Sequence, residues 1–141
     1  MARHYTGRDG ALYLSGNKVG KVRSWAITGN AAALETTTLG DAAATYVSGN
    51  LSYSGTAVVL MYENDANTLE GKGLLDPVFR TSANDPEATL SFELRMSNGS
   101  RTRRLGFNAV VTSVALGFQQ AGLVEYNVSF NVTGALSTVE L

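Results

Sequence analysis

The chain of 141 residues has no cysteine and only one histidine. Without cysteine it can form neither disulfides nor thiolate metal sites, and it has no cysteine nucleophile. One histidine, His4, cannot build a histidine-based metal site, and a catalytic triad would need that residue to be firmly positioned. His4 instead belongs to a polar segment, residues 1–9, which we expect to form an N-terminal arm. The sequence therefore predicts no metal, no cofactor and no enzymatic activity.

Charge is also scarce, because charged residues make up 16% of the chain and the formal net charge is −1. An isolated globule relies on surface charge for solubility, so this composition favours a surface that another chain covers. Residues 1–34 are mainly basic, residues 63–93 are mainly acidic, and arginines cluster over residues 95–104. These blocks are either local variation on a solvated surface or complementary faces that meet between subunits.

Long apolar runs are absent as well. No stretch approaches the ~20 apolar residues of a membrane helix. The first residues lack the apolar centre of a signal peptide. We therefore expect a protein that is made and folded in a cytoplasm and has no membrane partner.

Two segments, residues 88–97 and 123–133, alternate strictly between apolar and polar side chains. The apolar series are Leu90, Phe92, Leu94 and Met96, and then Val124, Tyr126, Val128, Phe130 and Val132. A period of two is typical of strands with one buried and one exposed face. The sequence predicts strands in both places.

The dipeptide Asn98-Gly99 suits a two-residue type I′ turn, which predicts a hairpin into a long strand over residues 100–118. In that strand Leu105 and Phe107 share one parity, whereas Val110, Val114, Leu116 and Phe118 share the other. A strand changes parity only through a bulge or bend, which we place near residues 108–111. With residues 123–133 these strands would form an antiparallel meander.

The N-terminal half is less regular. Strands at residues 11–14 and 19–28 flank a turn at Gly16-Asn17, and a long strand covers residues 51–62. Its end, residues 57–62, is apolar on both parities and so should be covered on both faces. Residues 64–76 read as a short helix that Pro77 ends, with Leu69 and Leu74 available for packing.

Residues 36–50 form a long connection of small residues. Connections of this length are usually functional, and this one could be a hairpin arm that rests on another chain. The whole chain, residues 1–141, is then one mainly β domain. We expect an antiparallel β-sandwich or partly closed barrel of about seven to eight strands, with one short flanking helix.

Two further features have alternative explanations. Arg101 and Arg103 share a strand face, and they could contact phosphates or pair with Glu93 or with acids of another subunit. Trp25 is either a core residue or an interface anchor, since tryptophan is enriched at interfaces.

The order of these features resembles the major tail tube proteins of long-tailed bacteriophages, within the wider superfamily of injection-device tubes. The matching pieces are the strand with Trp25, the runs 35–41 and 46–56, the apolar strand ending at Tyr62, the short helix, and the C-terminal hairpin 109–134. None of these pieces is a catalytic motif.

The resemblance implies a structural virion protein of the tail, assembled in the host cytoplasm. Copies would form a ring, expected to be hexameric, whose inner sheets join into one barrel around a lumen. Rings would stack head to tail, a heterologous contact that generates filaments. Its partners would be other copies, other tail proteins at the tube ends, and double-stranded DNA that passes through without specific binding.

The resemblance also assigns roles to residues. The loop that reaches the adjacent ring would include Thr36, Thr37, Thr38, Leu39, Gly40, Asp41 and Tyr46. The subunit-interface candidates are Trp25, Arg101, Arg103, Leu69 and Leu74. Glu93 and Glu125 are candidates for the lumen, where acidic or neutral residues would keep DNA from sticking.

Two other functions remain open from the sequence. One is the tube of a contractile injection or secretion device, which shares the fold and needs no DNA passage. The other is a monomeric carbohydrate-binding β-sandwich, which predicts a cluster of exposed aromatic residues to which Tyr46 and Tyr53 could contribute.

Overall fold

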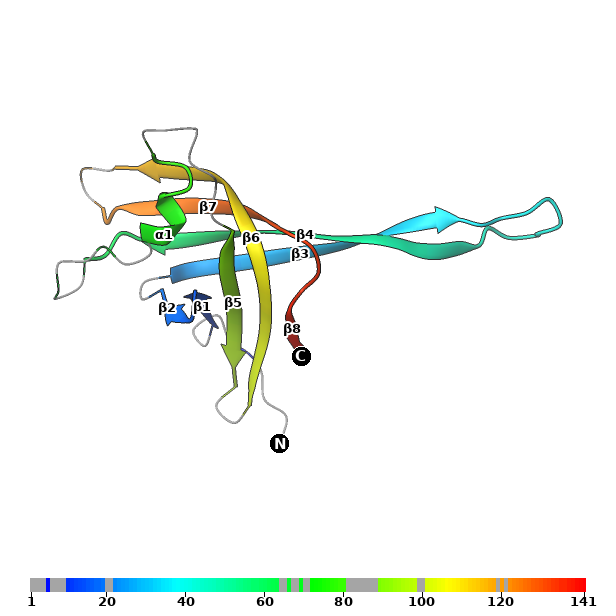
Figure 1. The fold of residues 1–141 in the computed structure, drawn as a ribbon, viewed down its shortest axis with the longest axis horizontal. Coiled ribbons are helices and arrows are strands. Elements are labelled where there is room, and N and C mark those ends of the chain that lie inside the picture. The colour runs from blue at the N-terminus through cyan, green and yellow to red at the C-terminus, as the bar shows by residue number, and fades with distance from the viewer. Residues whose placement is uncertain are drawn as a thin grey trace.

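Strands dominate the computed structural model. It describes residues 5, 10–19, 22–63, 66, 69, 72–80, 89–98, 101–118, 120 and 122–141. The strands are β1 (Gly10–Leu14), β2 (Asn17–Lys18), β3 (Val22–Glu35), β4 (Tyr46–Leu60), β5 (Leu90–Ser97), β6 (Thr102–Gly117), β7 (Glu125–Val132) and β8 (Thr138–Glu140), and the helix is α1 (Lys72–Leu75) (Figure 1). The predicted mainly β class with one short helix is confirmed.

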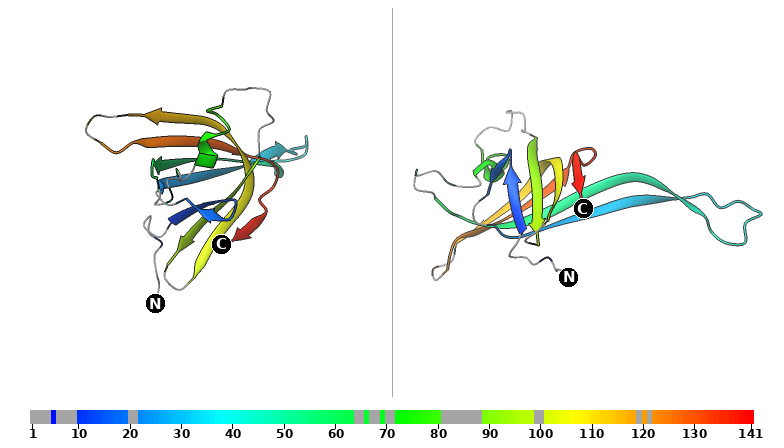
Figure 2. Two further views of the ribbon diagram at one scale, coloured as in Figure 1. Left: turned by 60° about the vertical axis from the view of Figure 1, so that its left-hand side comes forward. Right: turned by 90° about the horizontal axis from the view of Figure 1, so that it is seen from below.

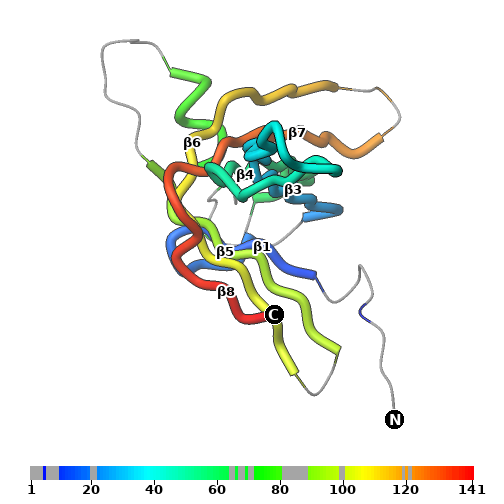
Figure 3. Tube along the Cα trace, turned by 90° about the vertical axis from the view of Figure 1, so that its right-hand side faces the viewer, coloured from blue at the N-terminus to red at the C-terminus, as the bar shows by residue number. Residues whose placement is uncertain are grey.

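All the strand pairings are antiparallel and join into one sheet. The strand order is β2-β1-β5-β6-β7-β4-β3, and β8 pairs with β6 off this path. The sheet bends sharply along β6, so that β5 and β1 lie apart from β7, β4 and β3 when the molecule is viewed along its long hairpin (Figure 3). The bend brings β1 near β3, but these two strands form no ladder, and the sheet stays a partly closed barrel.

The core fills the inside of this bend. Three rings from different strands, Phe92, Phe107 and Phe130, stack with centroids 4.9 to 5.6 Å apart. Each ring is almost fully buried, as is Tyr126 beside them. Stacked aromatic pairs of this kind add about 0.5–1.5 kcal/mol beyond the apolar area that they bury.

The parity change in β6 is present, and it follows Val111. Phe107, Ala109 and Val111 are buried on one parity, whereas Val114 and Leu116 are half-buried on the other. The register between β6 and β7 shifts between Val111 and Ser113. The bulge therefore lies just beyond the predicted residues 108–111.

Both predicted hairpins form, with differences at their turns. The β1–β2 turn is Ser15–Gly16, one residue earlier than predicted, and both residues have positive φ (52° and 84°), as a type I′ turn requires. The β5–β6 hairpin is confirmed by the pairing of Ser97 with Thr102. The predicted two-residue turn at Asn98-Gly99 is wrong, because it would pair Ser97 with residue 100, whereas the Asn98 N–H donates to the Arg101 carbonyl at 3.2 Å. Residues 99 and 100, which close the hairpin, lie outside the described residues.

The helix prediction over residues 64–76 was too long. The structure has a helix only at Lys72–Leu75, and Leu69 instead forms an isolated antiparallel bridge with Glu63. Gly71 and Gly73 disfavour a longer helix by about 1 kcal/mol each. Residues 64, 65, 67, 68, 70 and 71 lie outside the described residues.

Strands β3 and β4 form a hairpin that extends well beyond the rest of the sheet (Figures 1 and 2). They pair from Val22–Val59 to Glu35–Tyr46, whereas β7 covers β4 only from Ser54 onward. Residues 29–53, called the arm below, are therefore two-stranded. The seven residues of β3 in the arm, 29–35, at about 3.3 Å each give a ribbon about 23 Å long, closed by residues 36–45 at its tip.

Candidate functional site

The four adjacent strands β6, β7, β4 and β3 share a face that points away from the core. Their registers align its residues in three rows: Ala115–Asn127–Val58–Ser24, Ser113–Ser129–Thr56–Ala26 and Val110–Asn131–Ser54–Thr28. Every member is a small hydroxyl or amide residue, alanine or valine. This uncharged surface is called the polar face below.

The charged residues at the end of the polar face neutralise each other. Glu125 lies opposite Leu60 and Gly117, just beyond the row that contains Asn127. The guanidinium of Arg23, on β3, donates a hydrogen bond to its carboxylate. Glu125, predicted as a lumen residue, therefore adds no net charge to this surface.

The second lumen candidate, Glu93, lies on a different part of the sheet. It is on β5, between the buried Phe92 and Leu94, and it faces away from the core. Its carboxylate forms ion pairs with Arg95 and, at 3.8 Å, with Arg104. The structure therefore separates Glu93 from Glu125 and neutralises both.

The arginine cluster around Glu93 continues to the C-terminal strand. Arg104 donates a hydrogen bond of 2.9 Å to Glu140 on β8, and this pairing holds the pKa of Glu140 below its usual value of 4.5. Arg95 lies 3.9 Å above the centroid of the Tyr13 ring. The printed ion pairs of Glu93 are therefore with Arg95 and Arg104, not with Arg101 or Arg103 as the sequence suggested, and the role of Arg101 and Arg103 stays a prediction.

The interface candidates differ in how accessible they are. Trp25 and Leu69 are half-buried and pack against the core, and Arg101 is exposed. Arg103 donates to the hydroxyl of Tyr5 at 3.2 Å. Leu74 is fully buried within its own chain, so its assignment to a subunit interface needs correction: it is a core residue.

Two strand edges of the polar face have no partner among the described strands. One is the outer edge of β3, which ends the sheet. The other is the second half of β6, since β5 pairs only with residues up to Ala109. Unpaired edges present backbone donors and acceptors that another chain can pair with.

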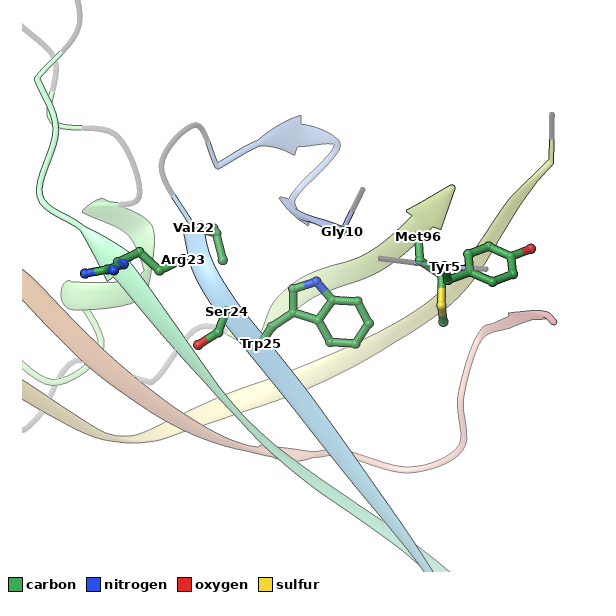
Figure 4. A pocket seen from close by; sticks show the side chains of 7 residues that line it. All are labelled: Tyr5, Gly10, Val22, Arg23, Ser24, Trp25 and Met96. Carbon is green, nitrogen blue, oxygen red and sulfur yellow. The ribbon is translucent and has the colours of Figure 1, made fainter. Parts of the chain in front are cut away.

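A pocket of about 300 Å³ lies beside the free edge of β3. Trp25 projects from β3 into it, toward Met96 and Tyr5, and Val22 lines its other end (Figure 4). The pocket occupies the gap that the bent sheet leaves between β3 and β5.

The arm tip is ordered by its own hydrogen bonds. The backbone N–H of Thr36 donates to the carbonyl of Thr45 at 2.8 Å, and the N–H of Thr45 donates to the Thr37 hydroxyl at 3.0 Å. Thr38 donates to the Asp41 carboxylate at 2.7 Å. Tyr46 pairs with Glu35 where the strands resume, and Leu39 and Gly40 are exposed at the end.

The aromatic cluster that a carbohydrate site needs does not form around the two tyrosines. Tyr46 lies at the far end of the arm and Tyr53 at its base, so most of the arm separates them. The part of the chain that the structure describes holds no group of three or more histidine or acidic side chains suited to a metal ion. Its only helix is far too short to span a membrane.

Comparison with known proteins identifies the fold. No protein-family model and no curated protein matches the chain. Among solved structures, the tail of an empty gene transfer agent particle with C6 symmetry has a TM-score of 0.69 at 18% identity, covering 94% of this chain and 96% of that chain. The SPP1 tail tube also scores 0.69, at 14% identity, with coverages of 98% and 81%.

A third match widens the set. A chain of the sheath–tube complex of the extracellular contractile injection system PVC scores 0.69 at 12% identity, with coverages of 96% and 93%. The chain thus has the fold found in phage, gene transfer agent and injection-system tube assemblies. The resemblance predicted from the sequence is confirmed at the level of the fold.

Proposed function

We propose that the chain is a structural virion protein, a tail tube subunit whose rings stack head to tail into a conduit for DNA. The observation that carries this proposal is the uncharged polar face, bounded on both sides by unpaired strand edges. A face of this kind can line a channel, while its two edges join it to neighbouring copies.

Strand direction makes such a ring feasible. The four strands β6, β7, β4 and β3 alternate in direction, so β6 and β3 run oppositely. When copies are related by rotation about one axis, the β3 edge of one copy meets the β6 edge of the next as an antiparallel pair. The half-buried Val114, near the β6 edge, would then reach the Trp25 pocket. We take six copies from the C6 symmetry of the gene transfer agent tail.

The chemistry of the polar face suits DNA passage. Double-stranded DNA binds proteins chiefly through lysine and arginine contacts to its phosphates. The three rows of the polar face contain neither residue type, and Arg23 is already paired with Glu125. The wall is therefore neutral rather than acidic, and DNA would pass without specific binding.

The arm would provide the contact between rings, with other tail proteins at the tube ends. One similar structure is a cap that terminates the tube of the anti-feeding prophage.

The second candidate function, the tube of a contractile injection device, is favoured by the likeness to the PVC complex. A conduit that carries no DNA would tolerate positive charge on its wall, so DNA passage through assembled tubes distinguishes the two.

Assembly through the seam between β3 and β6 can be tested with a matched pair of substitutions. Val114→Lys places a charge at the free β6 edge, whereas Val139→Lys places it on β8, away from that edge. We expect Val114→Lys to remain a folded monomer by circular dichroism and sedimentation, and Val139→Lys to assemble as the wild type does. Rings formed equally well by both variants would contradict the seam.

A further inference from the structure

Exposed large apolar side chains gather at the two opposite ends of the hairpin-bearing sheet. Thirteen such side chains are exposed among the described residues, and ten of them lie at these ends. Five are on the arm: Leu34, Leu39, Tyr46, Val47 and Leu51. The other five lie near the far end of β4, after α1, and at the β6–β7 tip: Tyr62, Val78, Phe79, Phe118 and Leu123. Figure 1 shows the arm on one side and α1 with the β6–β7 tip on the other.

The arm cannot cover its own apolar side chains. Leu34 and Val47 pair directly and so share one face, on which Leu34 also lies 3.2 Å from the position of a Cβ at Gly49. Leu51 and Tyr46 lie on the other face. They pair with Ala31 and Glu35, which alternate regularly along β3, and the extra residue of β4 at the register shift brings both side chains to the same side. A two-stranded ribbon is only marginally stable in water, so burial of both faces against another chain would stabilise it.

The opposite end offers a surface of the right kind. A groove of about 570 Å³ lies at the β6–β7 tip, and Leu116, Phe118 and Leu123 line it. Phe118 and Leu123 are 72% and 76% exposed, which is unusual for such large side chains at the end of a well-paired hairpin. Among the described residues that line the groove, Asn127 is polar and uncharged, and Glu125, which Arg23 neutralises, is the only charged one. Apolar side chains could therefore fill it without burying an unpaired charge.

Because these two apolar ends lie at opposite ends of the molecule, we infer that the arm of one copy packs on the groove lined by Leu116, Phe118 and Leu123 of a copy in the next ring. This inference rests on the proposed tube function and names the surface that receives the arm. In a head-to-tail stack the arm end of one copy always faces the opposite end of the next. The arm extends about 23 Å beyond the third strand, which is long enough to cross such a boundary.

The absence of cysteine allows a clean crosslinking test. Val47→Cys provides one attachment point on the arm for a benzophenone maleimide, and Leu51→Cys provides one on the opposite face of the arm. Each labelled variant is mixed with an excess of ¹⁵N-labelled wild-type chain, assembled, checked by electron microscopy and illuminated. Mass spectrometry then reports which ¹⁵N-labelled peptides are crosslinked, which excludes crosslinks within one chain.

We expect at least one of the two probes to label peptides that contain Phe118 or Leu123 of another copy. The control variant Val139→Cys, on β8, should label other peptides. Crosslinks from both arm positions to other regions, or no crosslink in well-formed tubes, would contradict the packing of the arm on this groove. Neither result would contradict the proposed tube function. Failure of the wild-type chain to form rings or tubes would overturn the proposed function itself.

Discussion

The guanidinium of Arg23 pairs with the carboxylate of Glu125 although β4 separates the strands that carry them. The two residues are 102 positions apart in the sequence. Their pairing removes net charge from the end of the polar face, and the rows beyond it contain only uncharged side chains. Both features together leave the polar face neutral.

A positive charge on the polar face should increase the amount of duplex DNA that tubes retain. Thr56→Lys puts an amine in the middle row of the polar face, whereas Thr102→Lys puts one at the start of β6, outside the three rows. We expect Thr56→Lys tubes to retain short duplex DNA at low salt and to release it as salt rises, because phosphate contacts are screened by counterions. Co-sedimentation of fluorescent duplex with tubes measures this, and equal retention by both variants would count against the wall assignment.

Removal of the arm should separate folding from stacking. Ala31 and Leu51 are paired, so a two-residue Asn-Gly turn can replace residues 32–50. No residue of the replaced segment is buried, so we expect a folded subunit whose melting temperature is close to that of the wild type. Stacked tubes should be lost under the electron microscope. Tubes formed by the shortened chain would show that the arm is not the contact between rings.

Gly55 should tolerate no side chain. A Cβ at this position would lie 2.5 Å from Cζ of Phe130 and 2.6 Å from the carbonyl oxygen of Ala26. We expect Gly55→Ala to lower the free energy of unfolding by about 1–3 kcal/mol, as overpacking does elsewhere. Gly117→Ala is the matched control, because a Cβ there meets no atom within 4 Å. Urea unfolding of both variants gives the comparison, and an unchanged midpoint for Gly55→Ala would contradict this packing.

Tyr126 should make the fold sensitive to alkali. Burial raises the pKa of Tyr126 to about 12, above its usual value of 10. The contribution of its neutral hydroxyl to stability is therefore fully present below pH 10 and is lost as the pH rises through 12. Tyr126→Phe should unfold at a higher pH than the wild type in a circular dichroism titration. Tyr13→Phe, on β1, is the control and should leave the alkaline midpoint unchanged.

Local patterns predicted some of this structure and long-range pairing decided the rest. Strict alternation around Phe92 and Phe130 predicted β5 and β7 because each strand has one buried face. The bulge in β6 was predicted to within a residue or two, since Val111 and Val114 differ in parity. The β1–β2 turn was misplaced because Gly16 fits either position of a type I′ turn, and the neighbouring Ser15 has positive φ here.

The candidate site was harder to predict than the strands. The polar face exists only because Thr56, Ser129 and Ser113 align across strands that are far apart in the sequence, and no local pattern contains that register. For the same reason the sequence predicted Glu125 as a lumen acid and missed its partner Arg23. The apolar end at Phe118 and Leu123 was missed because alternation alone does not tell an exposed strand end from a buried one.

The central claim, that this chain builds a tube from rings of itself, is tested most directly by electron microscopy of the purified protein at high concentration. The account predicts rings or tubes of uniform width with a central channel, and six-fold symmetry in end-on class averages. A monodisperse monomer at every concentration, confirmed by sedimentation, would contradict it.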